Sequence, residues 1–351
     1  LELAPFGNRV PQLSFEVLRA AQGAFANAAS NLQRAVRAVA MIPGTGEYAL
    51  ATTAVHYKEE EGVSRSANVN TPSEKSDFET AVGQLRDELP NVGSVSLVVS
   101  WFGNDLRAGH CTIQPKVEQK DHEGEGMAWR AGGITRAEAA EGVRVAGRSV
   151  YGGTPADQSV IEAIRHLRAG GQEVMFYPFI LMDQLEGNSL PNPWTGTPGQ
   201  PPLPWRGRIT TDLAPGLPGT TDRTAAAAAE VTAFFGTAQT DDFAVVDGQI
   251  HYTGPAEWRY RRFILHYAHL CALAGGVDAF CIGSEMVALT QIRGAGDSFP
   301  AVDALRDLLA EVRAILGPAV KLTYAADWSE YFGYAVDGNR YFHLDPLWAE
   351  P

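Results

Sequence analysis

The chain has 351 residues, 45% of them hydrophobic, and carries a net charge of −13 at pH 7. An acidic balance without a Lys/Arg cluster argues against nucleic-acid binding, which depends on neutralising phosphates. The three cysteines show no metal-ligand spacing, and Cys271 and Cys281 are predicted to be small core residues. No apolar run is long enough to span a membrane, and no signal-peptide pattern opens the sequence.

The N-terminal part, residues 1–45, is predicted to be the end of a preceding domain and a linker. Residues 1–17 fit a turn followed by an alternating strand. Residues 27–40 show the apolar spacing of a helix. Because the sequence starts at Leu1 without methionine and stops at Pro351 in mid-pattern, we expect it to be a segment of a longer polypeptide.

From residue 46 to residue 351, strand patterns alternate with helix patterns, as in a parallel α/β fold. Four strands are near-continuous apolar runs, the pattern of a sheet buried on both faces. These runs are residues 95–99, 174–180, 277–282 and 320–325. A weaker strand is expected near residues 48–57, and a hairpin over 243–252. Pro178 predicts a bulge or an early strand end. A closed eight-stranded barrel needs more strands than these.

Two long segments interrupt the alternation. Residues 110–148 are polar with scattered glycine and predict a loop insertion or a small excursion from the main fold. Residues 184–220 are rich in proline but keep tryptophans, so they predict an ordered lid over the C-terminal ends of the strands. A third, shorter polar run at residues 59–73 predicts an exposed loop.

Carboxylates follow the predicted strands, and chemistry in parallel α/β folds lies where strands end. Glu285 follows the strand 277–282 and is the candidate general acid. Asp327 and Glu330 follow the next strand and could supply the second carboxylate of a catalytic pair. Asp105 and Asp183 end the other two strands and are expected to converge on the same face as substrate-binding residues.

Each of these carboxylates also has a plain structural interpretation. Glu285 could form a salt bridge with a neighbour such as Arg293 or cap the next helix. Asp327 could cap the following turn, with Glu330 exposed to solvent. Retaining glycoside hydrolysis needs two carboxyl groups about 5–5.5 Å apart, and inverting hydrolysis needs about 6.5–9.5 Å.

Aromatic side chains near the strand ends could stack on the apolar C–H faces of sugar rings. The candidates are Trp101, Tyr177, Tyr324 and Trp328, and the alternative for each is an ordinary core or rim residue. The histidines show no convincing ligand spacing, and no glycine-rich phosphate loop with its lysine is present. We therefore expect no metal and no cofactor.

Six motifs fall in order along the chain and carry a resemblance to a known family. They are WFGNDLRAGHC (101–111), YGGTPADQSVIEAI (151–164), FYPFILMD (176–183), PWRGRIT (204–210), IGSEMVALT (282–290) and YAADWSEYFGY (324–334). Over residues 77–351 the sequence resembles the TIM-barrel-like domain of gene transfer agent tail proteins, which are multidomain baseplate and host-specificity proteins of phage-like particles. The opening FGNRVPQLSFEV resembles the end of the tail-tip domain that precedes this barrel.

The resemblance implies an α/β fold of the (β/α)8 TIM-barrel-like class, incomplete at its C-terminal end in this chain. That family resembles retaining glycoside hydrolases, whose fourth strand ends in Asn-Glu with the Glu as acid/base. Glu285 matches that Glu, while Ser284 stands where the Asn binds the sugar 2-hydroxyl, so Ser284 is a candidate substrate-binding residue. The clan's nucleophile is on the seventh strand, which is expected beyond residue 351.

Three functions remain open at this point. The first is a structural component of a phage-like tail tip, that is, a virion component. It would contact host envelope polysaccharide and other baseplate proteins. The symmetric tail assembly would be made in the bacterial cytoplasm. The second is an active glycoside hydrolase that cuts cell-wall or capsule glycan during entry. The third is a small-molecule barrel enzyme such as an aldolase. The absence of a lysine at the end of a predicted strand argues against this third function.

Overall fold

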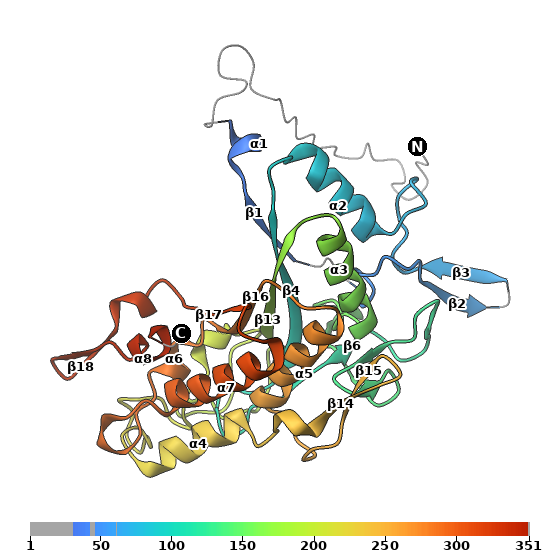
Figure 1. Ribbon diagram of the computed structural model, residues 1–351. Coiled ribbons are helices and arrows are strands. Elements are labelled where there is room, and N and C mark those ends of the chain that lie inside the picture. Colours follow the sequence, from blue (N-terminus) through green and yellow to red (C-terminus); the bar gives the residue numbers. More distant parts are fainter. Residues whose placement is uncertain (1–30, 43–45, 61, 350–351) are drawn as a thin grey trace.

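A computed structural model describes residues 31–42, 46–60 and 62–349 of the chain (Figure 1). Its centre is a parallel sheet with the strand order β1-β4-β13-β16-β17. The strands are Ala38–Met41 (β1), Ser94–Gly103 (β4), Glu173–Met182 (β13), Ala279–Ser284 (β16) and Lys321–Ala325 (β17). The last four are the strands predicted from the sequence, which are confirmed. The alternating strand predicted within residues 1–17 lies outside the described residues.

Helices connect successive strands of the sheet, as parallel pairing requires. The longer helices are Asp77–Glu88 (α2), Asp157–Ala169 (α3), Ala225–Phe235 (α4), Tyr260–Leu273 (α5) and Pro300–Leu316 (α7). In Figure 1, α3, α5 and α7 lie along one face of the sheet, and α5 contacts both of the others. The ring of Tyr267 on α5 packs 5.1 Å from Phe176 on β13 and 5.9 Å from Trp101 on β4, so this layer holds the main core.

Shorter elements surround this framework. The short helices are Leu32–Ala35 (α1), Val287–Thr290 (α6), Asp345–Trp348 (α8), Arg206–Arg208 (η3), Thr240–Asp242 (η4), Ala295–Asp297 (η5) and Glu330–Phe332 (η6). Hairpins form from His56–Glu60 (β2) with Val63–Ser66 (β3), Phe243–Val246 (β14) with Gln249–Tyr252 (β15), and Tyr334–Val336 (β18) with Asn339–Tyr341 (β19). The predicted hairpin over residues 243–252 is confirmed. None of the described helices is long and apolar enough to cross a bilayer.

The first insertion, residues 110–148, is an excursion made of two-residue strands. These are Ile113–Gln114 (β5), Lys116–Val117 (β6), Gly124–Glu125 (β7), Arg130–Ala131 (β8), Ile134–Thr135 (β9), Ala140–Glu141 (β10), Arg144–Val145 (β11) and, just beyond it, Arg148–Ser149 (β12). Trp129 and Val117 from this excursion join Tyr48 and Tyr57 in a second buried cluster. A buried ion pair fixes the excursion, with Arg136 Nη2 2.5 Å from Glu47 Oε2.

The N-terminal edge of the sheet differs from the prediction. The helix expected over residues 27–40 is wrong in its C-terminal part, because the chain is extended from Val36 and β1 pairs with β4 in parallel register. The strand expected near residues 48–57 forms only at its end, where His56 and Tyr57 begin β2 outside the main sheet. Tyr48 lies in a turn and packs on Tyr57, 6.0 Å away. The run at 59–73, predicted as a loop, starts with the β2–β3 hairpin.

One face of the sheet is only half-buried, although the apolar runs predicted burial on both faces. On β4 the buried residues alternate with Ser94, Ser96, Val98 and Ser100, which are half-buried. Among the described residues β17 pairs only with β16, and β1 only with β4, so the sheet does not close. The inner face therefore lacks the facing strands that would bury it, and the barrel is incomplete.

Pro178 does not end its strand, so the bulge predicted there is wrong. β13 continues to Met182 in unbroken register with β4. Its ladder with β16 consists of Met175 and Phe176 alone. Pro178 lies beyond that second ladder, so its missing N–H costs no hydrogen bond to β16. The proposed boundary between residues 45 and 46 stays a prediction; β1, which precedes it, already belongs to the sheet.

Candidate functional site

The C-terminal end of β16 is held by an arginine from the second insertion. Arg206, in η3, donates from Nε to the Ser284 carbonyl at 2.8 Å and from Nη2 to Ser284 Oγ at 2.7 Å. The same Nη2 lies 2.8 Å from Glu285 Oε2. The guanidinium carbon sits 3.8 Å above the centre of the Phe179 ring on β13. As predicted, residues 184–220 thus reach the strand ends.

Glu285 is partly exposed at this point, and Trp205 shares its carboxylate. Trp205 Nε1 donates to Glu285 Oε2 at 3.1 Å. The Trp205 residue is 42% exposed and the Glu285 side chain 38%, so both offer surface to a ligand. Glu285 does form a salt bridge, as the structural alternative predicted, but its partner is Arg206. The predicted partner, Arg293, pairs with Asp222.

The backbone at Glu285 is strained. Its φ angle is +48°, in the left-handed region where a residue with a side chain is uncommon. A hydrogen bond of 2.8 Å from the Glu285 N–H to the Ala325 carbonyl of β17 fixes this conformation. A backbone conformation of this kind destabilises the fold by about 1–3 kcal/mol, and residues that adopt it cluster at functional sites. The strain therefore supports Glu285 as a site residue.

Tyr177 and Ser284 join the same network from the inner face of the sheet. Their hydroxyl oxygens are 2.5 Å apart. Burial raises the pKa of Tyr177, and this exceeds the lowering that the Ser284 hydrogen bond produces. Burial also lowers the pKa of the Arg206 guanidinium, while the Glu285 charge opposes that change. Ser284 is buried and fully engaged, so it orients Arg206 and Tyr177.

The end of β17 holds the other two predicted catalytic carboxylates in structural roles. Asp327 Oδ2 accepts hydrogen bonds from Ser329 N at 2.8 Å and Ser329 Oγ at 2.5 Å, which confirms the turn-capping alternative. Glu330 is 2% exposed, so the expectation that it is solvated is wrong. It accepts from Thr290 Oγ1 at 2.8 Å and from the Tyr324 hydroxyl at 3.1 Å. Burial raises the pKa of Glu330.

Asp105 and Asp183 follow the neighbouring strands β4 and β13, and both are buried and paired. Asp105 lies 2.7 Å from Arg107 Nη2 and 2.7 Å from Gln200 Nε2. Asp183 lies 2.5 Å from Lys116 Nζ. Their predicted role in substrate binding is therefore not supported by their placement. Each carboxylate is neutralised by a basic side chain, so both stabilise the fold.

The predicted aromatic residues divide by exposure. Trp101 is fully buried and donates from Nε1 to the Tyr267 hydroxyl at 3.0 Å, so the prediction that it contacts substrate is wrong. Tyr324 is also buried, and its hydroxyl accepts a hydrogen bond from Met286 N at 2.8 Å. Trp328 is 74% exposed. Exposed aromatic side chains near the strand ends thus include Trp205, Trp328, Tyr331 and Phe332.

Arg206 and Trp205 fall within the segment predicted as a lid, but no role at the site was predicted for either residue. The motif PWRGRIT, which carries both, was the available signal. In the part of the chain that the structure describes, no group of three or more His, Cys, Asp or Glu side chains could hold a metal ion.

The sheet topology defines the class of the domain as α/β and TIM-barrel-like, with an incomplete barrel. A family model described as the GTA TIM-barrel-like domain matches residues 258–351, the C-terminal part of the resemblance in the sequence. No curated protein matches the chain.

The solved structures that are similar to the chain include two mannanases. One is described as a complex structure of GH113 beta-1,4-mannanase, at 14% identity and a TM-score of 0.34, covering 72% of this chain and 50% of that one. The other is described as a structure of GH113 beta-1,4-mannanase, at 16% identity and a TM-score of 0.35, covering 73% and 52%. This chain spans about half the length of either structure.

Proposed function

We propose that this domain binds bacterial envelope glycan at the end of β16 without cutting it, as a component of the tail tip of a phage-like particle of the gene transfer agent type. One observation carries the binding part of the proposal. The partly exposed Trp205 ring and the partly exposed Glu285 carboxylate lie side by side at a strand end, joined by a 3.1 Å hydrogen bond.

This pair has the chemistry that recognises a sugar. An indole ring offers an apolar face on which the C–H face of a pyranose can stack. The carboxylate offers acceptors for the hydroxyl groups at the edge of that ring, and hydrogen bonds to a charged acceptor are about twice as strong as neutral ones. Arg206, held by Ser284 and Phe179, fixes the carboxylate in position. The site is therefore preorganised for binding.

Hydrolysis, the alternative function, is less well supported. Both retaining and inverting mechanisms need a second carboxyl group across the scissile bond. Asp327 is engaged in its own turn, and Glu330 is buried among Thr290 and Tyr324. Glu285 Oε2 already accepts from Arg206 and Trp205. Among the described residues these contacts leave no carboxylate free to act with Glu285, so the described part of the barrel supports glycan binding.

The tail context is supported by the six ordered motifs and by the family match over residues 258–351. In that setting the partners would be other baseplate proteins and the polysaccharide of the host surface.

The proposal is tested with purified envelope glycans from a bacterial host. Wild type, Glu285→Gln and the control Glu186→Gln, an exposed glutamate in the same insertion, are compared for bound glycan and for released reducing ends. We expect all three to bind, with Glu285→Gln several-fold weaker and no reducing ends released. Release of reducing ends by wild type and by Glu186→Gln, but not by Glu285→Gln, would establish hydrolysis instead.

A further inference from the structure

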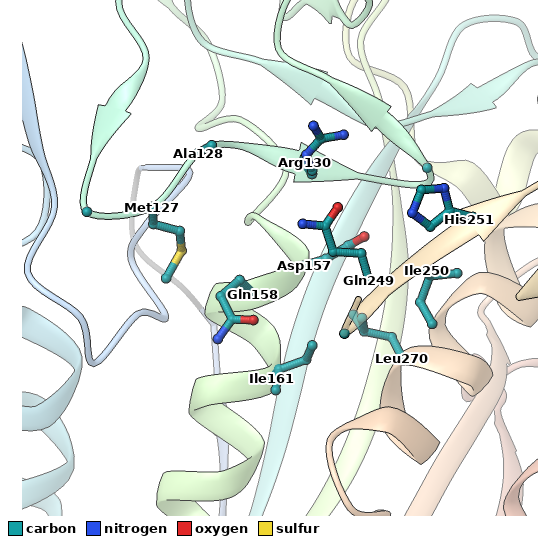
Figure 2. A pocket seen from close by; sticks show the side chains of 13 residues that line it. Met127, Ala128, Arg130, Asp157, Gln158, Ile161, Gln249, Ile250, His251 and Leu270 are labelled. Carbon is teal, nitrogen blue, oxygen red and sulfur yellow. The ribbon is translucent and has the colours of Figure 1, made fainter. Parts of the chain in front are cut away.

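A cavity of about 210 Å³ lies between the first insertion, the start of α3, α5 and the β14–β15 hairpin (Figure 2). It shares no lining residue with the Glu285 network. Its apolar part consists of Met127, Ile161, Ile250 and Leu270, all buried. An engineered apolar cavity of about 150 Å³ holds benzene. This cavity therefore has room for one ring with a short polar arm.

A buried carboxylate forms part of the cavity wall. Asp157, the first residue of α3, has a side chain only 13% exposed. Its Oδ1 lies 2.9 Å from Nε2 of His266, which is 1% exposed. The backbone nitrogen of Gly132 lies 3.3 Å from the same Nε2. Among the described residues no hydrogen-bond donor contacts Oδ2, so that oxygen can accept from a ligand.

The rim of the cavity adds acceptors. Gln158 and Gln249 are exposed and line the same cavity as Asp157 (Figure 2). Their amide oxygens can accept hydrogen bonds beside the carboxylate. The Arg130 guanidinium, also at the rim, points away from Asp157 in the same view. The cavity therefore offers a carboxylate and two side-chain amides as hydrogen-bond acceptors.

We propose that this cavity binds a small organic cation, an ammonium group carried on a compact apolar body, with Asp157 as its counter-ion. The ammonium group supplies the donors that Asp157 Oδ2 and the glutamine amides lack, and the apolar body fills the space above Ile161 and Leu270. A buried carboxylate favours a charged donor over a neutral hydroxyl, because hydrogen bonds to a charged partner in a desolvated site are the stronger ones. This inference is independent of the glycan site.

Calorimetric titration of benzylamine into the protein at pH 7 tests the proposal, with benzyl alcohol and benzoate as neutral and anionic probes of the same shape. We expect benzylamine to bind with a Kd on the order of 1 mM and the other two at least tenfold more weakly. An acetylated, amidated lysine is titrated in parallel. Binding of this probe assigns the cation to a side chain of a protein partner, and binding of benzylamine alone assigns it to a free amine.

Variants locate the binding. Asp157→Asn is expected to weaken benzylamine at least tenfold. Because this change also alters the first residue of α3, a second position is tested on the exposed hairpin at the mouth of the cavity. Gln249→Lys adds a positive charge there and should weaken binding. Gln249→Glu adds a negative charge and should strengthen it. Gln84→Lys on the exposed face of α2 adds the same charge elsewhere and should change nothing. Absence of benzylamine binding, equal binding of benzyl alcohol, or affinity unaffected by Gln249→Lys would overturn the proposal.

Discussion

Replacing Arg206 with alanine is expected to lower the free energy of unfolding by about 2–4 kcal/mol. The guanidinium is 5% exposed, donates to both oxygens of Ser284 and stacks on Phe179. A desolvated cation–π contact contributes about 2 kcal/mol, and a hydrogen bond that involves a charged group about 1.5–3 kcal/mol. The contact with Glu285 adds little, since that carboxylate is partly exposed to solvent.

Urea denaturation of Arg206→Ala and of a matched control measures this effect. The control Arg208→Ala removes an arginine from the same short helix. The guanidinium carbon of Arg208 lies 5.5 Å from the centre of the Trp194 ring. We expect the control to lose less than about 1 kcal/mol, as surface substitutions do. Equal losses for the two variants would show that Arg206 does not anchor the insertion to β16.

The stability of the domain is expected to rise with pH because of His343. This residue is 4% exposed, and burial lowers the pKa of its imidazole to about 4, against smaller raising effects from the Tyr341 backbone and Asp345. Since the folded pKa is depressed, the unfolded chain binds more protons between about pH 4 and 6.5. The contribution of His343 to the free energy of unfolding is therefore fully present above the pKa that this residue has in the unfolded chain. It is lost as pH falls toward 4, by roughly 3 kcal/mol in total.

His343→Gln should remove this pH dependence. Unfolding free energies of wild type and variant are measured in urea from pH 4 to 7.5, and their difference is expected to grow with pH up to about 6.5. Glu330, which shares Thr290 with His343, acts in the opposite direction: its raised pKa makes its contribution fall as pH rises above its unfolded value. Glu330→Gln is the control for that opposing slope. Parallel curves for wild type and His343→Gln would refute the assignment.

The sequence was sufficient for the parallel sheet, because each long apolar run between helices became a strand. It was not sufficient for β1, whose four residues depend on pairing with β4, a contact more than fifty positions away in the chain. A run as short as Ala38–Met41 carries no pattern of its own that would outweigh the preceding helical spacing. Tertiary pairing decided its conformation.

The candidate site shows the same division. Glu285 could be predicted because it directly follows a strand. Its partner Arg206 is 79 residues away, and spacing alone could not pair them. The error at Trp101 was avoidable: in the run from Ser94 to Trp101, serines alternate with apolar residues, so Trp101 falls on the same face as Val95 and Leu97, away from the serines. That face packs against the helices.

We propose that Trp205 and Glu285 at the end of β16 form a glycan-binding site. The most direct measurement is calorimetric titration of purified host envelope glycan into wild type, Trp205→Ala and Trp194→Ala, the last removing a partly exposed tryptophan of the same insertion. We predict that Trp205→Ala binds at least tenfold more weakly than wild type and that Trp194→Ala changes the affinity less than about twofold. Equal affinity for wild type and Trp205→Ala would contradict the claim.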